Sequence, residues 1–237
     1  MDQRIRIVIP TYNERENIRV LIPEIFEVSE RNSLDIDILI VDDNSPDGTG
    51  EFAKELSNEY PVNVLERDEK SGLGSAYIRG FEESLNDGRD IIFEMDADMS
   101  HKPEYIPSFL EKIEDGFDVV MGERKDVVGW GLYRRTVSWG GNFIGKIIAG
   151  IDIDDLTTGY RAYKREVLEH IDLYSIDSDG YAFQLEILSK VLDENFNVGS
   201  VPIVFHDRKR GKTKLSNWDI LEFFKVATKI RLSKLFI

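Results

Sequence analysis

Short apolar segments alternate with amphipathic ones through the first half of this chain, and this alternation restricts the fold more than any other feature. The apolar segments have the length of strands and are apolar almost throughout, as strands covered on both faces are. We expect strands at Arg4–Pro10, Asp35–Asp43, Val62–Glu66, Asp90–Asp96 and Asp118–Gly122. Helical periodicity predicts helices at Glu16–Glu30, Gly50–Glu59, Gly74–Asn86 and Pro103–Asp115. The repeat predicts an α/β fold with a mostly parallel, Rossmann-like central sheet flanked by helices.

The alternation breaks after Gly122. The second half predicts, in order, a helix at Leu132–Ile148, turns at Asp154–Tyr160, a strand at Arg161–Tyr163, a helix from Ala182 to about Glu194 and a strand at Val198–His206. The C-terminal segment, Asn217–Ile237, predicts an amphipathic helix that carries lysines and an arginine among its apolar residues. Such a helix packs on the protein's own core or lies in a membrane interface. The apolar C-terminus favours an exposed surface for lipid or a partner.

Two carboxylates follow the fourth expected strand. Asp96 and Asp98 flank Ala97, shortly after the apolar run Ile91–Phe93. Because side chains alternate along a strand, both carboxylates can face one spot at the carboxyl edge of the sheet, where open α/β folds bind ligands. Their oxygens suit Mg²⁺ or Mn²⁺ held together with substrate phosphates. An acidic surface turn has the same short pattern, so the neighbouring strand ends decide between the two interpretations.

Polar residues also follow the first two expected strands. The first strand ends in Pro10-Thr11-Tyr12-Asn13-Glu14, and the second in Val41-Asp42-Asp43-Asn44-Ser45-Pro46-Asp47-Gly48-Thr49. Parallel strands bring these ends to the same edge as Asp96 and Asp98, so three polar segments converge on one crevice. Asp43 can accept hydrogen bonds from a base or a ribose, and Tyr12 offers an aromatic face and a hydroxyl group. Together the three segments favour a ligand site over an acidic turn.

Glycine-rich phosphate loops do not account for this site. No Gly-x-Gly-x-x-Gly follows the first strand and no P-loop signature occurs anywhere, which argues against dinucleotide and P-loop enzymes. The nearest glycine-rich segment, Lys70-Ser71-Gly72-Leu73-Gly74, suits either a plain entry into a helix or a close approach of backbone amides to a sugar or phosphate.

Composition narrows the functional classes further. The 237 residues carry a formal net charge of −15, which argues against a partner made of nucleic acid. Two basic clusters, residues 134–135 and 206–214, still offer local sites for an anion. There is no cysteine, hence no disulfide or thiolate chemistry, and no apolar run long enough to span a bilayer. Without a linker of Pro, Ser or Gly composition, we expect one domain over residues 1–237.

The strand ends resemble the opening of family 2 glycosyltransferases of the GT-A fold, and within that family the dolichol-phosphate mannose synthases. Asp96-Ala97-Asp98-Met99-Ser100-His101-Lys102-Pro103 is similar to the metal motif of that group. Later blocks resemble it in the same order: Asp155-Leu156-Thr157-Thr158-Gly159-Tyr160-Arg161, Gly180-Tyr181-Ala182-Phe183-Gln184-Leu185-Glu186, Val201-Pro202-Ile203, Asp207-Arg208 and Lys214-Leu215. The resemblance extends over nearly the whole chain.

The resemblance implies roles for particular residues. The nucleotide sugar would be bound by Pro10, Tyr12, Glu14, Val41, Asp43, Asp96 and Ala97. The metal, Mg²⁺ or Mn²⁺, would be held by Asp96, Asp98 and Ser100. Some members have glutamine at the position of Ser100, so Ser100 binds the metal directly or through water. The catalytic set would be Asp96, Asp98, Arg124 and Arg208, and the acceptor phosphate would contact Arg124, Arg134, Arg208 and Lys214.

The implied reaction is the inverting transfer of mannose from GDP-mannose to dolichyl or another polyprenyl phosphate. A phosphate nucleophile is already an anion at neutral pH, which agrees with the lack of a convincing catalytic triad in the sequence. The resemblance further implies a nucleotide-sugar half (1–124), an acceptor- and membrane-facing half (125–237), and a location in the cytoplasm or peripherally on the cytoplasmic face of a membrane. A small membrane-anchoring partner is a further possibility.

Three alternatives remain at this stage. The same enzyme class could use UDP-glucose or UDP-N-acetylglucosamine, because a base or one hydroxyl is read by few contacts. A regulatory subunit could keep the fold and bind the nucleotide sugar without turnover. A sugar-nucleotide pyrophosphorylase has a related sheet, but it would be expected to carry a glycine-rich signature after the first strand, which this chain lacks.

Overall fold

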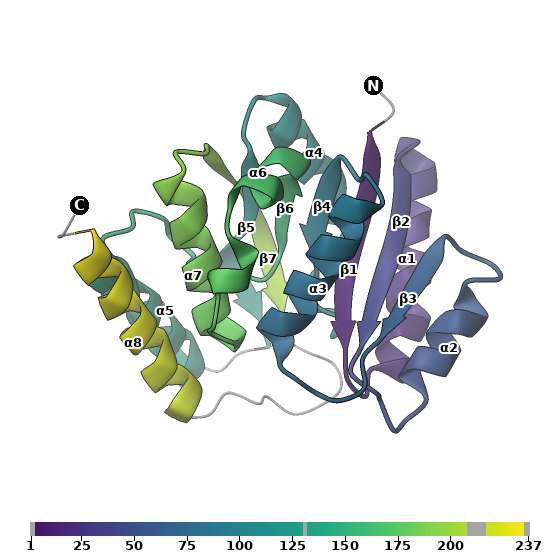
Figure 1. Ribbon diagram of the computed structural model, residues 1–237, viewed down its shortest axis with the longest axis horizontal. Helices are drawn as coiled ribbons and strands as arrows, with labels where there is room; N and C mark the ends of the chain where they lie inside the picture. Colours follow the sequence, from purple (N-terminus) through teal and green to yellow (C-terminus); the bar gives the residue numbers. More distant parts are fainter. Residues whose placement is uncertain (1–2, 130–131, 208–216, 235–237) are drawn as a thin grey trace.

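The computed structural model describes residues 3–129, 132–207 and 217–234, with the backbone alone for 132–139 and 217. Within these residues a seven-stranded sheet lies between two layers of helices (Figure 1). The strands are β1 (Arg4–Thr11), β2 (Asp35–Asp42), β3 (Val62–Glu66), β4 (Ile91–Glu94), β5 (Val119–Val128), β6 (Arg161–Lys164) and β7 (Val198–His206). The helices are α1 (Arg15–Asn32), α2 (Thr49–Leu56), α3 (Leu73–Asn86), α4 (Ile106–Glu114), α5 (Leu132–Ala149), α6 (Arg165–His170), α7 (Gly180–Asp193) and α8 (Asn217–Ser233). Two 3-10 turns, η1 (Pro103–Tyr105) and η2 (Leu173–Ser175), complete the order.

The sheet is mostly parallel, as the sequence predicted. Its strand order is β3-β2-β1-β4-β6-β5-β7. Strands β1 to β4 pair in parallel, β5 and β7 pair in parallel, and β6 runs antiparallel between β4 and β5. The chain reaches β6 from the carboxyl edge of the sheet, where Thr157 and Gly159 line a cavity, so β6 must run in the opposite direction. The chain leaves β1 toward β2 on one side, while β4 lies on the other, which creates a topological switch point.

Three boundaries differ from the predictions. Strand β4 ends at Glu94, two residues before Asp96, because the Asp96 amide bonds to His101 and not to a neighbouring strand. Strand β5 does not end at Gly122 as predicted: it continues to Val128, since β7 pairs with it along its whole length around a bulge. Helix α6 was not predicted, because six residues are too few to produce a clear helical period.

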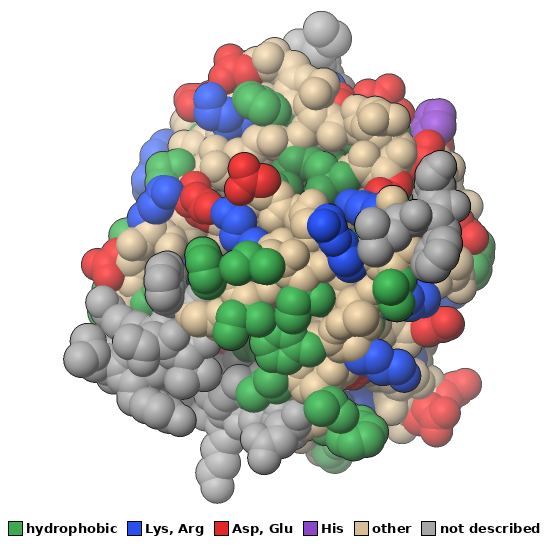
Figure 2. Space-filling view, turned by 90° about the vertical axis from the view of Figure 1, so that its left-hand side faces the viewer, with side chains coloured by type: hydrophobic (Ala, Val, Ile, Leu, Met, Phe, Trp, Pro, Cys, Tyr) green, Lys and Arg blue, Asp and Glu red, His purple; other side chains and the backbone are tan. Residues whose placement is uncertain are grey.

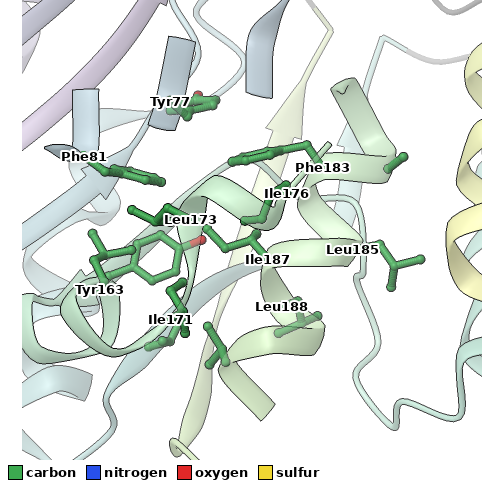
Figure 3. Close-up of a cluster of buried hydrophobic side chains, with 14 of the residues drawn as sticks. Tyr77, Phe81, Tyr163, Ile171, Leu173, Ile176, Phe183, Leu185, Ile187 and Leu188 are labelled. Carbon is green, nitrogen blue, oxygen red and sulfur yellow. The ribbon is translucent and has the colours of Figure 1, made fainter. Parts of the chain in front are cut away.

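Each face of the sheet has its own apolar core, because alternate strand residues point to opposite faces. On one face, the isoleucines of β1 and β2 pack against α1 and α4. On the other, Val8 and Val41 pack against α3 and belong to a larger core that also contains residues of α6, α7 and α8. Figure 3 shows the aromatic part of this second core, where Tyr77 and Phe81 of α3 meet Phe183 of α7. The rings of Tyr77 and Phe183 stack with centroids 6.0 Å apart.

Helix α3 lies unusually close to β1, and one glycine permits it. A Cβ atom at Gly80 would lie 2.3 Å from Cγ1 of Val8, far inside van der Waals contact. Only a residue without a side chain fits at this crossing. The close approach brings the hydroxyl of Tyr77, one turn earlier on α3, to the end of β4.

Helix α8 packs on the protein's own core with one side and leaves apolar residues exposed on the other. Phe223, Val226, Ala227 and Ile230 are buried against the rest of the protein. Trp218, Leu221 and Leu232 are exposed on the opposite side of the same helix. None of the helices in the described part of the chain is both long and apolar enough to cross a membrane.

Candidate active site

The polar ends of β1, β2 and β4 meet at one cavity, as predicted. The cavity has a volume of about 340 Å³ and opens at the carboxyl edge of the sheet. Six of the residues predicted to bind a nucleotide sugar line it: Pro10, Tyr12, Glu14, Asp43, Asp96 and Ala97. The seventh, Val41, is fully buried in the core and lies beneath the cavity wall, so its side chain acts in packing.

Asp42 connects the loop after β1 with the loop after β2. The sequence analysis did not single out this residue. Its carboxylate accepts hydrogen bonds from the Thr11 hydroxyl at 2.8 Å and from the amide of Ser45 at 2.9 Å. The Ser45 hydroxyl in turn accepts the amide of Asn13 at 3.0 Å. Asn13 and Asn44 both have left-handed backbone, with φ of 61° and 53°, so the chain turns sharply at both tips. Asp42 is therefore the structural member of the acidic pair, and Asp43 is the one that lines the cavity.

Asp43 is held by a cation that the sequence did not suggest. Nε of Arg67 lies 2.7 Å from Oδ1 of Asp43, and both side chains are nearly buried. Burial raises the pKa of Asp43, while Arg67 opposes that rise by favouring the charged form. Tyr12 lines the same cavity, and Nζ of Lys70 lies 4.3 Å from the centre of its ring. This end of the cavity thus combines a fixed carboxylate with an aromatic face.

Asp96 and Asp98 lie in a turn and not on a strand, which corrects the alternation argument. The turn is made by the left-handed backbone of Met99, with φ of 68°. Asp98 Oδ1 accepts the amide of Ser100 at 3.0 Å, and Asp96 Oδ1 accepts the Tyr77 hydroxyl at 3.1 Å. Both aspartates line the main cavity and a smaller cavity beside it, so they still act on one spot.

The chemistry of these donors suits a hard divalent cation. Ser100 is 1% exposed and lines the smaller cavity, and within the described structure its hydroxyl oxygen has no hydrogen-bond partner. A hydroxyl oxygen beside two carboxylates is an oxygen-rich donor set. In the part of the chain that is described, no three acidic or histidine side chains form a ready-made metal cage. A cation here would therefore take its remaining ligands from water and substrate phosphates.

A buried carboxylate, Glu94, lies under the turn and was missed from the sequence. It is 0% exposed and accepts the Tyr163 hydroxyl at 2.9 Å. Burial raises its pKa to about 7, against the lowering effects of Arg161, Gln184 and Tyr163. The sequence analysis treated Glu94 as part of an apolar strand, because its neighbours Phe93 and Met95 are apolar.

Arg124 lines the smaller cavity together with both aspartates. Its Nη2 atom lies 2.6 Å from Oδ1 of Asp155 and 2.6 Å from the Thr157 hydroxyl. Burial acts to raise the pKa of Asp155, but the charge of Arg124 and the hydrogen bonds from Arg124 and Thr157 together outweigh it and lower that pKa. Arg124 is thus anchored on one side by a buried ion pair.

The other predicted acceptor residues are not placed by the structure. Arg208 and Lys214 lie outside the described residues, and only the backbone of Arg134 is described, in α5. Their proposed contacts with a phosphate stay predictions.

The fold defines the class of the protein. The structure matches crystal structures of glucosyl-3-phosphoglycerate synthase from Mycobacterium tuberculosis, with a TM-score of 0.69 and 18% identity over 99% of this chain and 81% of that chain. It also matches mannosyl-3-phosphoglycerate synthase from Rubrobacter xylanophilus, with a TM-score of 0.69 and 19% identity over 98% of this chain and 74% of that chain. The fold is that of the GT-A glycosyltransferases.

Sequence comparison then gives the family. Residues 6–172 match the family model described as Glycosyl transferase family 2, and the chain belongs to this family. It is 42% identical to the polyprenol monophosphomannose synthase of Mycolicibacterium smegmatis, over 95% of this chain and 86% of that protein. It is 40% identical to the undecaprenyl-phosphate mannosyltransferase of Micrococcus luteus, over 90% and 88%. It is 39% identical to the dolichol-phosphate mannosyltransferase of Pyrococcus furiosus, over 94% of this chain and 62% of that protein.

Proposed function

We propose that this protein transfers mannose from GDP-mannose to a polyprenyl phosphate such as dolichyl phosphate. The observation that carries the proposal is the 42% identity to a polyprenol monophosphomannose synthase over 95% of the chain. Two further relatives, named as mannosyltransferases that act on undecaprenyl phosphate and dolichol phosphate, support the same acceptor class. The reaction inverts the anomeric centre, because the acceptor phosphate attacks it directly.

The donor occupies the main cavity in this proposal. Asp43, fixed by Arg67, accepts hydrogen bonds from the nucleoside, and Tyr12 lies against it. Asp96, Asp98 and Ser100 hold Mg²⁺ or Mn²⁺ with the donor diphosphate, which fits the oxygen donors at the two cavities. When bound, the cation supplies charge stabilisation for the departing diphosphate.

The acceptor phosphate approaches through the smaller cavity. Arg124 lines it beside Asp98, so a guanidinium faces the space next to the donor diphosphate. Arg134, Arg208 and Lys214 would also contact the acceptor phosphate in this proposal. Residues 1–124 then supply most of the nucleotide-sugar site, and residues 125–237 meet the acceptor and complete the wall of the main cavity with residues such as Thr157, Gly159 and Gln184. The phosphate is already ionised, so its alignment matters more than a general base.

The proposed acceptor is a lipid, so the proposed function implies that the protein contacts a membrane. We define the apolar face as the exposed apolar side chains of α5 and α8: Phe143, Ile144, Ile147, Trp218, Ile220, Leu221 and Leu232. Figure 2 looks onto this side and shows apolar side chains gathered at its centre with basic side chains nearby. Lys225, Lys229 and Arg231 of α8 are exposed, although the whole chain is acidic. Apolar and basic groups together suit an anionic lipid surface, so we propose peripheral association with the cytoplasmic face of a membrane.

The test is transfer of radiolabelled sugar into an organic-extractable lipid. Purified protein is incubated with dolichyl phosphate, Mg²⁺ or Mn²⁺, and GDP-mannose, UDP-glucose or UDP-N-acetylglucosamine in parallel. We expect metal-dependent label in the lipid from GDP-mannose alone, lost in Asp98→Ala and kept in Asp115→Ala, an exposed acid at the end of α4. Label from a UDP-sugar would replace the proposed donor. Nucleotide binding without transfer would indicate either a non-catalytic subunit or the need for a small membrane-anchoring partner. Adding membranes that contain the partner distinguishes the two explanations, because it restores transfer only in the second.

A further inference from the structure

Gln184, in the second turn of α7, is a buried polar side chain without a satisfied hydrogen bond. It is 3% exposed and lines the main cavity. Within the described structure, neither its amide oxygen nor its amide nitrogen has a hydrogen-bond partner. Leaving a buried polar group unpaired costs about 1–3 kcal/mol, so native proteins rarely do so unless a ligand or water completes the pair.

Gly159 lies opposite Gln184 in the wall of the cavity. A Cβ atom at Gly159 would lie 3.4 Å from Nε2 of Gln184 and 3.7 Å from Oδ1 of Asp96. Gly159 therefore keeps open a small space that both polar groups border. This space belongs to the same cavity as Asp43 and Tyr12, and it borders Asp96, the residue proposed to hold the metal with the donor diphosphate.

The backbone that carries Gln184 is fixed on two sides. Asp179, just before α7, accepts the amide of Gly74 at 2.7 Å and so joins the helix to the loop that begins α3. Phe183, next to Gln184, stacks on Tyr77 in the core (Figure 3). An amide on such a rigid support can discriminate between positions of a ligand group, because little conformational freedom remains to be lost.

Gln184 already affects one neighbouring polar group, Glu94. The amide favours the charged form of that carboxylate and lowers its pKa, but the two make no hydrogen bond of normal geometry. A primary amide has two donor hydrogens and an acceptor oxygen. Even an improved contact with Glu94 would occupy one of these, which leaves the others for a ligand in the cavity.

We propose that Gln184 hydrogen-bonds a hydroxyl group of the donor hexose and determines which hexose the protein accepts. The inference rests on the proposed function, because it takes the occupant of the cavity to be a nucleotide-linked sugar. A sugar hydroxyl both donates and accepts, so it matches a primary amide. A site built around a buried polar group rejects analogues that leave this group unpaired. Gln184 is thus a specificity-determining residue and takes no part in bond making.

The test measures binding, so it needs no acceptor lipid. Calorimetry in the presence of Mn²⁺ gives the dissociation constants of GDP and GDP-mannose for the wild type, Gln184→Met and Ser189→Ala. Methionine keeps the volume of glutamine without its hydrogen bonds. Ser189 is a matched control, since it is a polar residue of α7, is 4% exposed and does not line the cavity. We expect Gln184→Met to weaken GDP-mannose binding about tenfold and to leave GDP binding within about twofold.

Specific results would overturn the inference. Equal weakening of GDP and GDP-mannose binding would mean a structural role, and unchanged dissociation constants for both ligands would mean no contact with the sugar. If Gln184→Met does not fold, Gln184→Asn, which keeps a shorter amide, takes its place. GDP-mannose analogues that each lack one hydroxyl complete the test: one analogue must bind wild type and variant equally, and if none does, the inference fails.

The same measurement separates this inference from the proposed function. If lipid transfer is never observed but the sugar contribution to binding is lost in Gln184→Met, the inference stands and the proposed acceptor falls. If the wild type prefers a UDP-sugar, the binding of that sugar nucleotide is compared with the binding of UDP, and only the identity of the donor is revised. If no nucleotide sugar binds more tightly than its nucleotide, the inference itself is wrong.

Discussion

Nδ1 of His101 accepts a hydrogen bond from the backbone amide of Asp96 at 3.1 Å, which fixes the imidazole in the tautomer with its hydrogen on Nε2. The ring is 2% exposed and stacks on Tyr160, with centroids 5.0 Å apart. His101 therefore connects the turn that carries both aspartates to the start of β6. The turn owes its shape to this histidine as well as to the left-handed Met99.

Replacing His101 should weaken metal binding without removing a ligand. His101→Ala frees the Asp96 amide, and losing such a supporting bond typically lowers metal affinity or activity about tenfold or more. We expect a corresponding rise in the Mn²⁺ concentration needed for half-maximal GDP binding, and a smaller rise in His101→Asn, which keeps an acceptor. His170→Ala, at an exposed site on α6, serves as the control. An unchanged Mn²⁺ requirement in His101→Ala would exclude this role.

The buried Glu94 should make the metal-free protein less stable as the pH rises. Its folded pKa of about 7 lies above its ordinary value of 4.5, so between these values the folded state binds more protons than the unfolded state. The free energy of unfolding then falls with rising pH across this window, by roughly 3 kcal/mol in total, and is flat above it. Urea denaturation from pH 4.5 to 8 should show this slope reduced in Glu94→Gln and kept in Glu55→Gln, an exposed control. Parallel curves for all three proteins would contradict the prediction.

The ion pair of Arg124 and Asp155 should be important for stability. Their side chains are 10% and 7% exposed, so Asp155→Asn leaves a buried guanidinium without a counter-charge. We expect a loss of about 3–5 kcal/mol in the free energy of unfolding. The exposed pair of Glu27 and Arg31 is the control, where Glu27→Gln should cost less than about 1 kcal/mol. Similar losses at the two sites, measured by urea denaturation at pH 7, would mean that Asp155 does not compensate Arg124.

The apolar face should mediate binding to lipid. Leu221→Glu introduces a charge into its exposed centre, and Lys225→Glu reverses a charge beside it. Each basic residue near an anionic surface contributes about 1 kcal/mol, so Lys225→Glu should weaken vesicle binding by at least fivefold at low salt. Co-sedimentation with vesicles of phosphatidylglycerol and phosphatidylcholine measures the binding of each variant. Val20→Glu, on α1 at another surface, should bind as the wild type does; equal effects at both places would argue against a specific face.

Gly80 should not tolerate a side chain. Gly80→Ala places a Cβ atom against Val8 and forces α3 away from β1, which should cost about 1–3 kcal/mol. Gly140→Ala in α5 is the matched control, since a Cβ atom there meets nothing within 4 Å and alanine favours a helix by about 0.5–1 kcal/mol. Thermal unfolding should therefore move in opposite directions in the two variants. A stable Gly80→Ala would show that α3 can shift freely.

The site was predictable where its residues lie at the ends of strands. Tyr12, Asp43 and Asp96 were identified because apolar strands stop directly before them, and parallel strands share an edge. The direct argument for Asp96 and Asp98 was nevertheless wrong in detail, since β4 ends earlier and a turn brings them together. The prediction that both carboxylates face one spot is nevertheless confirmed, because both line the same two cavities.

The sequence by itself determined the order of strands and helices in the first half, the mostly parallel sheet, and the carboxyl edge as the site. These follow from the period of apolar residues, which is a local property of the chain. Only the tertiary structure decided that Asp42 joins the loops while Asp43 lines the cavity, that Arg67 pairs with Asp43, and that Gln184 is left unpaired beside Asp96. Each of these depends on side chains far apart in the sequence that meet only when both faces of the sheet are packed, and no local pattern records such a meeting.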